Sequence, residues 1–255
     1  MNSQAILTAW CVGMSLLSGC VHAVEGALKP GATLSAVSEA GVPLKLRIDA
    51  VKPDPQDTLG EVLLYDVSFL DETDQQWKAL CLPDREGHTT AIPLQGSWNQ
   101  RGEYRASDAL ITFACTNGVI AKCVRWGYKP WKTVNGQSLE PFHYACTRMA
   151  RADYCGNGHG HTRDGTLIDV SDVLGLQKPT ASDTLVLEAA WSPDGATYVN
   201  RARYAEPLEE LFAECPERLK GHTALDLPGL TPEQIRSRWP QTLLFNSSVP
   251  KTERP

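Results

Sequence analysis

The sequence predicts an α+β domain with a mainly antiparallel β-sheet, a few short helices and stabilising disulfides. Segments with strand patterns outnumber those with helical patterns, and they lack the regular strand–helix alternation of a parallel sheet. Six cysteines follow the N-terminal segment, an even number that suits disulfide bonding. The chain has 255 residues, and we expect one large domain rather than two small ones.

Residues 1–19 are expected to be a signal peptide. The apolar run from Ala5 to Leu17 is too short to span a bilayer and small residues follow it. Leu17-Ser18-Gly19-Cys20 resembles the lipobox of bacterial lipoproteins, in which the cysteine is lipidated and becomes the new N-terminus. Residues 21–23 also fit ordinary signal cleavage, which would release a soluble protein. We favour lipidation of Cys20, with a membrane as partner through the lipid anchor.

Residues 20–43 are expected to be a flexible tether, and residues 44–255 a single domain. Gly, Ala, Ser and Pro dominate 24–43 without a sustained period. From Leu44 onward, "PLKLRIDAV" and "EVLLYDVSFL" alternate apolar and polar residues as half-buried strands do. The segments "QQWKALCL", "TTAIPL" and "DALITFACT" continue the β character.

The second half of the chain mixes helices and strands. Asn117-Gly118 predicts either a hairpin or a strand that turns into a short helix. Apolar residues recur every three or four positions over 139–154, which predicts an amphipathic helix ended by Cys155-Gly156. A short strand in "TLIDVSDVLG", a hairpin around 192–195 and a helix in "EPLEELFAECPERL" follow. A capping box at 231–234 begins the last helix.

The six cysteines of the mature chain are candidates for up to three disulfides in an oxidising compartment. Fifteen pairings are possible, and buried free thiols are the alternative. Cys146 lies more than two helical turns before Cys155, so Cys155 is expected to bond a distant cysteine such as Cys115, Cys123 or Cys215. The candidates are Cys81, Cys115, Cys123, Cys146, Cys155 and Cys215.

The glycine-rich loop "ADYCGNGHGHTRDGT", residues 152–166, has three interpretations. It is a structural loop pinned by Cys155, a catalytic or substrate-binding loop, or a metal site. In the catalytic interpretation a histidine held by Asp164 acts as general base, and the candidate catalytic residues are His159, His161, Asp164 and Asp153. We favour the structural loop. We expect the two histidines to be partly exposed and not joined around an ion, with no metal bound.

The net charge and the sequence motifs restrict the classes of partner and of chemistry that the chain is expected to have. The net charge of −6 and the absence of a basic patch argue against nucleic acid. No nucleophile elbow, HExxH or Walker loop is present, and no cofactor is expected. Trp126, Tyr128 and Trp131 in "WGYKPW" are candidates for a stacking platform, although core packing is the preferred interpretation.

Two resemblances to known families bear on function. Residues 151–156, with Asp164-Gly165-Thr166, "AKCVRWGYKPW" and "EAAWSPDGA", resemble the ADYC domain family of exported bacterial proteins, which has no assigned activity. Cys123-Val124-Arg125 is similar to the end of the nucleophile motif of cysteine L,D-transpeptidases, but Ala121-Lys122 stands where that motif has His-Gly. The first resemblance implies an exported location and supplies no catalytic residues.

We therefore expect an envelope lipoprotein that acts as a non-catalytic binding or structural domain. It would be anchored to the outer membrane or lie in the periplasm, or alternatively be secreted in soluble form, with an envelope polymer or protein as partner. The alternative is an enzyme that acts on peptidoglycan or another glycan through the 152–166 loop. Convergence of His159, His161 and Asp164 would favour the enzyme.

Overall fold

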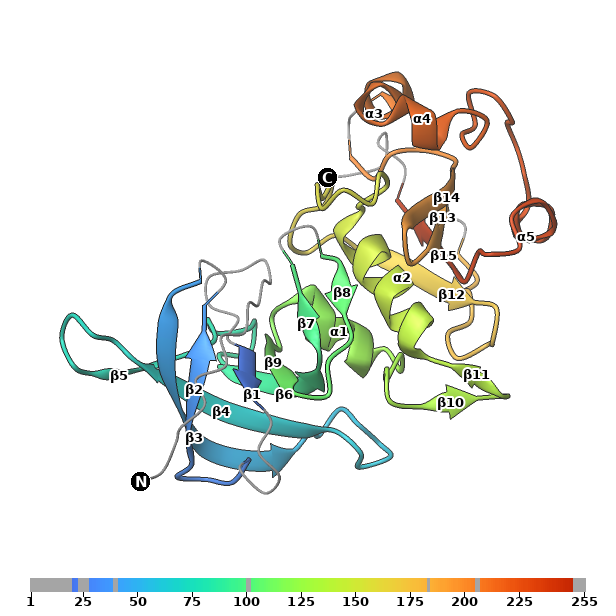
Figure 1. The fold of residues 1–255 in the computed structure, drawn as a ribbon. Helices are drawn as coiled ribbons and strands as arrows, with labels where there is room; N and C mark the ends of the chain where they lie inside the picture. Colours follow the sequence, from blue (N-terminus) through green and yellow to red (C-terminus); the bar gives the residue numbers. More distant parts are fainter. Residues whose placement is uncertain are drawn as a thin grey trace. The chain divides into compact units, whose positions relative to one another are not determined.

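The computed structural model describes residues 20–22, 28–38, 41–99, 102–182, 184–204 and 207–249. The described part of the chain divides into two compact units, with the boundary between Arg125 and Trp126 (Figure 1). A single domain over residues 44–255 stays a prediction. The expected signal peptide, residues 1–19, lies outside the described residues. Lipidation of Cys20 stays a prediction. Among the described residues, no helix is both long and apolar enough to cross a membrane.

The first unit contains a seven-stranded antiparallel sheet with strand order β3-β2-β1-β9-β6-β4-β5. Because β3 also pairs with β4, six of these strands close into a ring and β5 extends from it. The elements of this unit are β1 Cys20–His22, β2 Thr33–Val37, β3 Pro43–Pro53, β4 Leu63–Leu70, β5 Trp77–Ala79, β6 Thr90–Gln95, β7 Ser97–Trp98, β8 Tyr104–Arg105, β9 Leu110–Cys115 and helix α1 Val119–Arg125.

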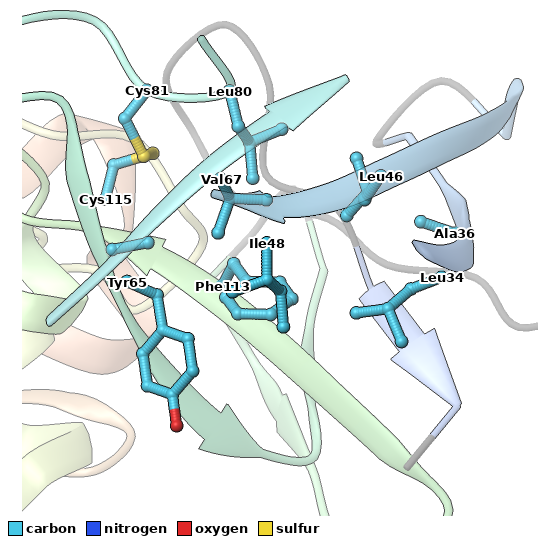
Figure 2. Packing of buried hydrophobic residues seen from close by; sticks show 11 residues of the cluster. Leu34, Ala36, Leu46, Ile48, Tyr65, Val67, Leu80, Cys81, Phe113 and Cys115 are labelled. Carbon is cyan, nitrogen blue, oxygen red and sulfur yellow. A yellow bond between two sulfur atoms is a disulfide. The ribbon is translucent and has the colours of Figure 1, made fainter. Parts of the chain in front are cut away.

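The core of the first unit lies on the apolar face of these strands. Ile48, Val67 and Phe113, from three different strands, point toward one another, and Leu34 and Leu46 continue the cluster (Figure 2). Each of the five is at most 7% exposed. The strands predicted from Leu44 to Thr116 are thereby confirmed.

Part of the expected tether is folded. β2 pairs along its whole length with β3, and Leu34 and Ala36 are buried in the core while Thr33 and Ser35 are exposed. The alternation of apolar and polar residues in "TLSAV" is a strand pattern. The glycines and prolines on either side of this segment are typical of a linker, and they led to the prediction of a tether. The pairing of β2 with β3 shows that the folded region begins before Leu44.

Helix α1 begins directly after Asn117-Gly118. The strand-to-helix alternative is therefore correct at this turn, and the hairpin alternative is wrong.

The second unit contains a four-stranded antiparallel sheet of order β12-β15-β13-β14, with α2 packed against β13, β14 and β15. The predicted hairpin joins β13 and β14, and the predicted capping box is present at Thr231 and Gln234. The elements of this unit are β10 Thr133–Val134, β11 Gln137–Ser138, α2 Glu140–Arg151, β12 Ile168–Asp172, β13 Val186–Ser192, β14 Gly195–Val199, α3 Leu208–Glu214, α4 Pro216–Leu219, α5 Pro232–Arg238 and β15 Leu244–Ser248.

Candidate functional site

The loop of interest begins where α2 ends. Ala152 is the C-cap and adopts a left-handed conformation with φ of 53°. The helix therefore ends three residues earlier than predicted, and Gly156 is not its cap. Ending at Ala152 lets the backbone N–H of Asp153 donate to the Arg148 carbonyl at 2.9 Å, which satisfies a carbonyl of the last turn.

Asp153 is fully buried and forms an ion pair with Arg148. Its Oδ2 lies 2.6 Å from Nη1 of Arg148 and accepts the backbone N–H of Gly158 at 3.0 Å. The Arg148 side chain also donates through Nε to the Pro193 carbonyl at 3.3 Å. The carboxylate thus ties the helix end to the loop that follows. Asp153 was expected among the catalytic residues, but its position is that of an internal structural charge.

Tyr154 is also fully buried and lies within a second polar network. Its hydroxyl donates to Oε1 of Glu188 at 3.0 Å and accepts the backbone N–H of Arg203 at 2.7 Å. Its ring stacks on Trp191 with centroids 5.2 Å apart. Burial, reinforced by the negative charge of Glu188, raises the pKa of Tyr154 well above its usual value.

Glu188 and Arg203 form the charged centre of this network. Nε of Arg203 lies 3.1 and 3.0 Å from the two Glu188 carboxylate oxygens, and Nη2 lies 2.9 Å from Oε1. Burial opposes the charge on Arg203, but the charge of Glu188 outweighs it and raises the pKa of the guanidinium. Arg203 also donates to the carbonyls of Met149 and Ala150, so it neutralises the C-terminal end of α2.

Cys155 and Gly156 complete the segment 151–156 that carries the family resemblance, which is called the motif from here on. Cys155 is bonded to Cys215, as expected, with a Cα–Cα distance of 5.9 Å. Gly156 has a φ of +69°, and a Cβ built on it would lie 1.8 Å from the Asp194 carbonyl oxygen. Only glycine fits this close approach to the β13–β14 hairpin.

The other four cysteines that were candidates for disulfides are bonded as well. Cys81 is bonded to Cys115, and Cys123 and Cys146 are each in a disulfide. The described part of the chain contains no free cysteine. Cys123 therefore cannot be a thiolate nucleophile, which excludes the transpeptidase resemblance as a guide to chemistry.

The histidines of the loop converge on a carboxylate that the sequence analysis did not identify. His159 Nδ1 lies 3.1 Å from both oxygens of Glu214, and His161 Nε2 lies 3.0 Å from Glu214 Oε2. The centroids of the two imidazole rings are 4.5 Å apart. His159 is exposed, as expected, but His161 is only 8% exposed because its ring packs against Tyr154, contrary to the prediction.

Asp164 does not join this cluster. It lies exposed in a turn, and Glu214 at the end of α3 takes the place that the sequence analysis assigned to it. Burial alone would raise the pKa of Glu214, but the hydrogen bonds from Asn157 and His159 and the charges of the two histidines outweigh it and lower that pKa. The site therefore combines two imidazoles with an ionised carboxylate.

The aromatic candidates have different environments. Tyr128 is fully buried, stacks on Phe142 and donates its hydroxyl to Asp172 at 3.0 Å. Trp126 is half-buried, whereas Trp131 is 50% exposed. Core packing thus accounts for Tyr128, and Trp131 retains a surface available to a ligand.

The sequence analysis did not identify four charged residues of the site, Arg148, Glu188, Arg203 and Glu214. Glu188 stands inside the apolar strand "VLEAAW", and a charge in such a position signals a buried partner, here Arg203. Glu214 precedes Cys215, so knowledge of the Cys155–Cys215 pairing would have placed it beside the histidine loop.

Comparison with protein families identifies the region that contains this loop. A family model of the ADYC domain matches residues 30–205, which includes β2 and the whole 152–166 loop but ends before Glu214 and Cys215. No curated protein and no solved structure matches the chain. The family model spans more than half of the sequence and contains the motif whose contacts are described above. The chain therefore belongs to the ADYC domain family.

Proposed function

We propose that the chain is an exported, non-catalytic domain that binds or supports a component of the bacterial envelope and is anchored through a lipid on Cys20. One observation carries the non-catalytic part of the proposal. Asp153, Tyr154 and Cys155 are buried and engaged in an ion pair, a hydrogen-bond network and a disulfide. Groups committed in this way stabilise the fold and are not available to a substrate.

Export is supported by the cysteines and by the lipobox-like segment. Disulfides persist in oxidising compartments, and Leu17-Ser18-Gly19-Cys20 supplies an attachment point for lipid. Cells that express the full chain and are fed a clickable palmitate should yield labelled protein in the membrane fraction. The Cys20→Ser variant should remain unlabelled. Unlabelled wild-type protein released in soluble form would overturn the lipid anchor.

Binding can be tested with the mature chain lacking the lipid. We expect the protein to sediment with isolated envelope fragments, and we expect Trp131→Ala to weaken this binding because the indole is half exposed. Leu167→Ala is the matched control, since Leu167 is an exposed apolar residue of the same unit. Equal sedimentation of the two variants would remove Trp131 from the binding surface, and failure of the wild type to sediment would contradict binding.

The second candidate function is an enzyme that acts on an envelope polymer. The convergence of His159, His161 and Glu214 favours it, because histidines beside a carboxylate can transfer protons near neutral pH. Incubation with peptidoglycan followed by chromatography of the soluble fraction separates the two functions. The proposal predicts no released fragments. Fragments that disappear in the Glu214→Gln variant would establish the enzyme instead.

A further inference from the structure

We propose that His159, His161 and Glu214 bind one divalent transition-metal ion of the Zn²⁺ type. This inference is independent of the proposed function, because an ion here can stabilise the loop whether or not the protein binds an envelope component. Two of the three residues lie in the motif-bearing loop, and the third lies at the end of α3.

The distances suit a single ion. One ligand atom from each residue can be chosen so that all three lie within 4.8 Å of one another. Glu214 Oε2 lies 3.1 Å from His159 Nδ1 and 3.0 Å from His161 Nε2. Ligands that bind zinc tetrahedrally at about 2.0–2.2 Å are about 3.3–3.6 Å apart. The two histidine nitrogens are at most 4.8 Å apart, so side-chain rotations that bring them closer are enough to hold an ion.

The donor chemistry favours zinc over the common hard cations. Two imidazole nitrogens and one carboxylate oxygen form a ligand set that zinc accepts, whereas Ca²⁺ and Mg²⁺ prefer oxygen ligands throughout. Three protein ligands leave a fourth position for water. The side chain of His159 is 64% exposed, so this position faces solvent and an ion can enter directly.

Neighbouring groups hold the ligands in place. Asn157 Nδ2 donates to Glu214 Oε1 at 3.1 Å, and the His161 ring is fixed against Tyr154. The backbone N–H of His161 donates to the Ala152 carbonyl at 3.3 Å, which attaches the loop to the cap of α2. Such outer contacts orient metal ligands before the ion arrives.

The Cys155–Cys215 disulfide brings the two ligand segments together in advance. Along the chain, His159 and Glu214 are 55 positions apart. Through the disulfide the path is much shorter, because His159 is the fourth residue after Cys155 and Glu214 directly precedes Cys215. A closed loop roughly tenfold shorter favours assembly of the ligands by about 30-fold. The disulfide and the ion would thus join the same two segments.

Titration calorimetry with Zn²⁺ alone, on untagged full-length mature protein stripped with chelator, tests the site. We expect one ion per chain, and we expect His159→Ala and Glu214→Gln to weaken binding by more than about 100-fold, a greater loss than that of an outer contact. Both altered residues lie at the surface, so the variants should fold. Thermal unfolding without metal checks that they do.

His88→Ala is the matched control. His88 is exposed, with Nδ1 3.4 Å from Glu86 and 3.6 Å from Asp84, but among the described residues it belongs to no group of three potential ligands close enough to hold an ion. Zinc binding should be unchanged in this variant. Failure of the wild type to bind zinc, or binding that persists in both His159→Ala and Glu214→Gln, would overturn the site. Neither result would affect the envelope-binding experiment.

Discussion

Replacing Asp153 with asparagine removes one charge from a fully buried ion pair and leaves the shape of the side chain nearly unchanged. The Arg148 guanidinium, whose side chain is 6% exposed, then keeps its charge without the carboxylate 2.6 Å away. Loss of one partner from a buried pair costs about 3–5 kcal/mol of the free energy of unfolding. An asparagine oxygen can still accept the Gly158 N–H, so the loss comes mainly from the charge.

Guanidinium chloride unfolding followed by far-UV circular dichroism measures this loss. Asp164→Asn is the control, because it makes the same change at an exposed position of the same loop and should alter stability by less than about 0.5 kcal/mol. The Arg148→Met/Asp153→Leu variant should recover part of the stability, since neither member of this ion pair then leaves the other as an unpaired buried charge. An Asp153→Asn protein that loses less than about 1 kcal/mol would refute the structural role of the carboxylate.

Three further predictions concern the same motif. Gly156→Ala should prevent stable folding, judged by expression of soluble protein, whereas Gly175→Ala, with a similar φ of +74° and open space around it, should cost only about 1 kcal/mol. Because burial raises the pKa of Tyr154, the free energy of unfolding should fall by up to about 1.4 kcal/mol per pH unit above pH 10, and Tyr154→Phe should show a shallower fall in alkaline unfolding series. The folded state favours the neutral phenol of Tyr154. The contribution of Tyr154 to stability is therefore complete below its pKa in the unfolded chain, and it is lost as the pH rises toward its pKa in the folded protein. Removing the disulfide with Cys155→Ser/Cys215→Ser should cost about 4 kcal/mol in denaturant unfolding, from the closure of a loop with a sequence separation of 60. An unchanged midpoint in that variant would contradict the loop-closure argument.

Local signals in the sequence were sufficient for several elements. The turn at 192–195, the capping box at Thr231 and the periodicity of α2 each depend on residues within a few positions of one another, and the structure has all three. Asn135-Gly136, between β10 and β11, is an equally strong turn signal. The sequence analysis does not predict this hairpin, because strands of two residues are too short to show an alternating pattern.

The remaining features depend on contacts between distant segments. β2 is stabilised by pairing with β3, and its composition alone indicates a linker. Glu214 reaches the histidines because a disulfide joins Cys155 to Cys215, and fifteen pairings of six cysteines were open from the sequence. Asp153 was classed with the catalytic candidates because burial, which makes it structural, is a property of the packed chain and not of the motif.

Peptide mapping without reduction tests the central claim, that the motif fixes the loop by buried structural contacts. Trypsin cleavage after Arg151 and Arg163 releases peptide 152–163, and cleavage after Arg203 and Arg218 releases peptide 204–218. The structure predicts these two peptides as one disulfide-linked species that separates on reduction. Recovery of peptide 152–163 with a free Cys155 thiol, or linked to a peptide other than 204–218, would contradict the account.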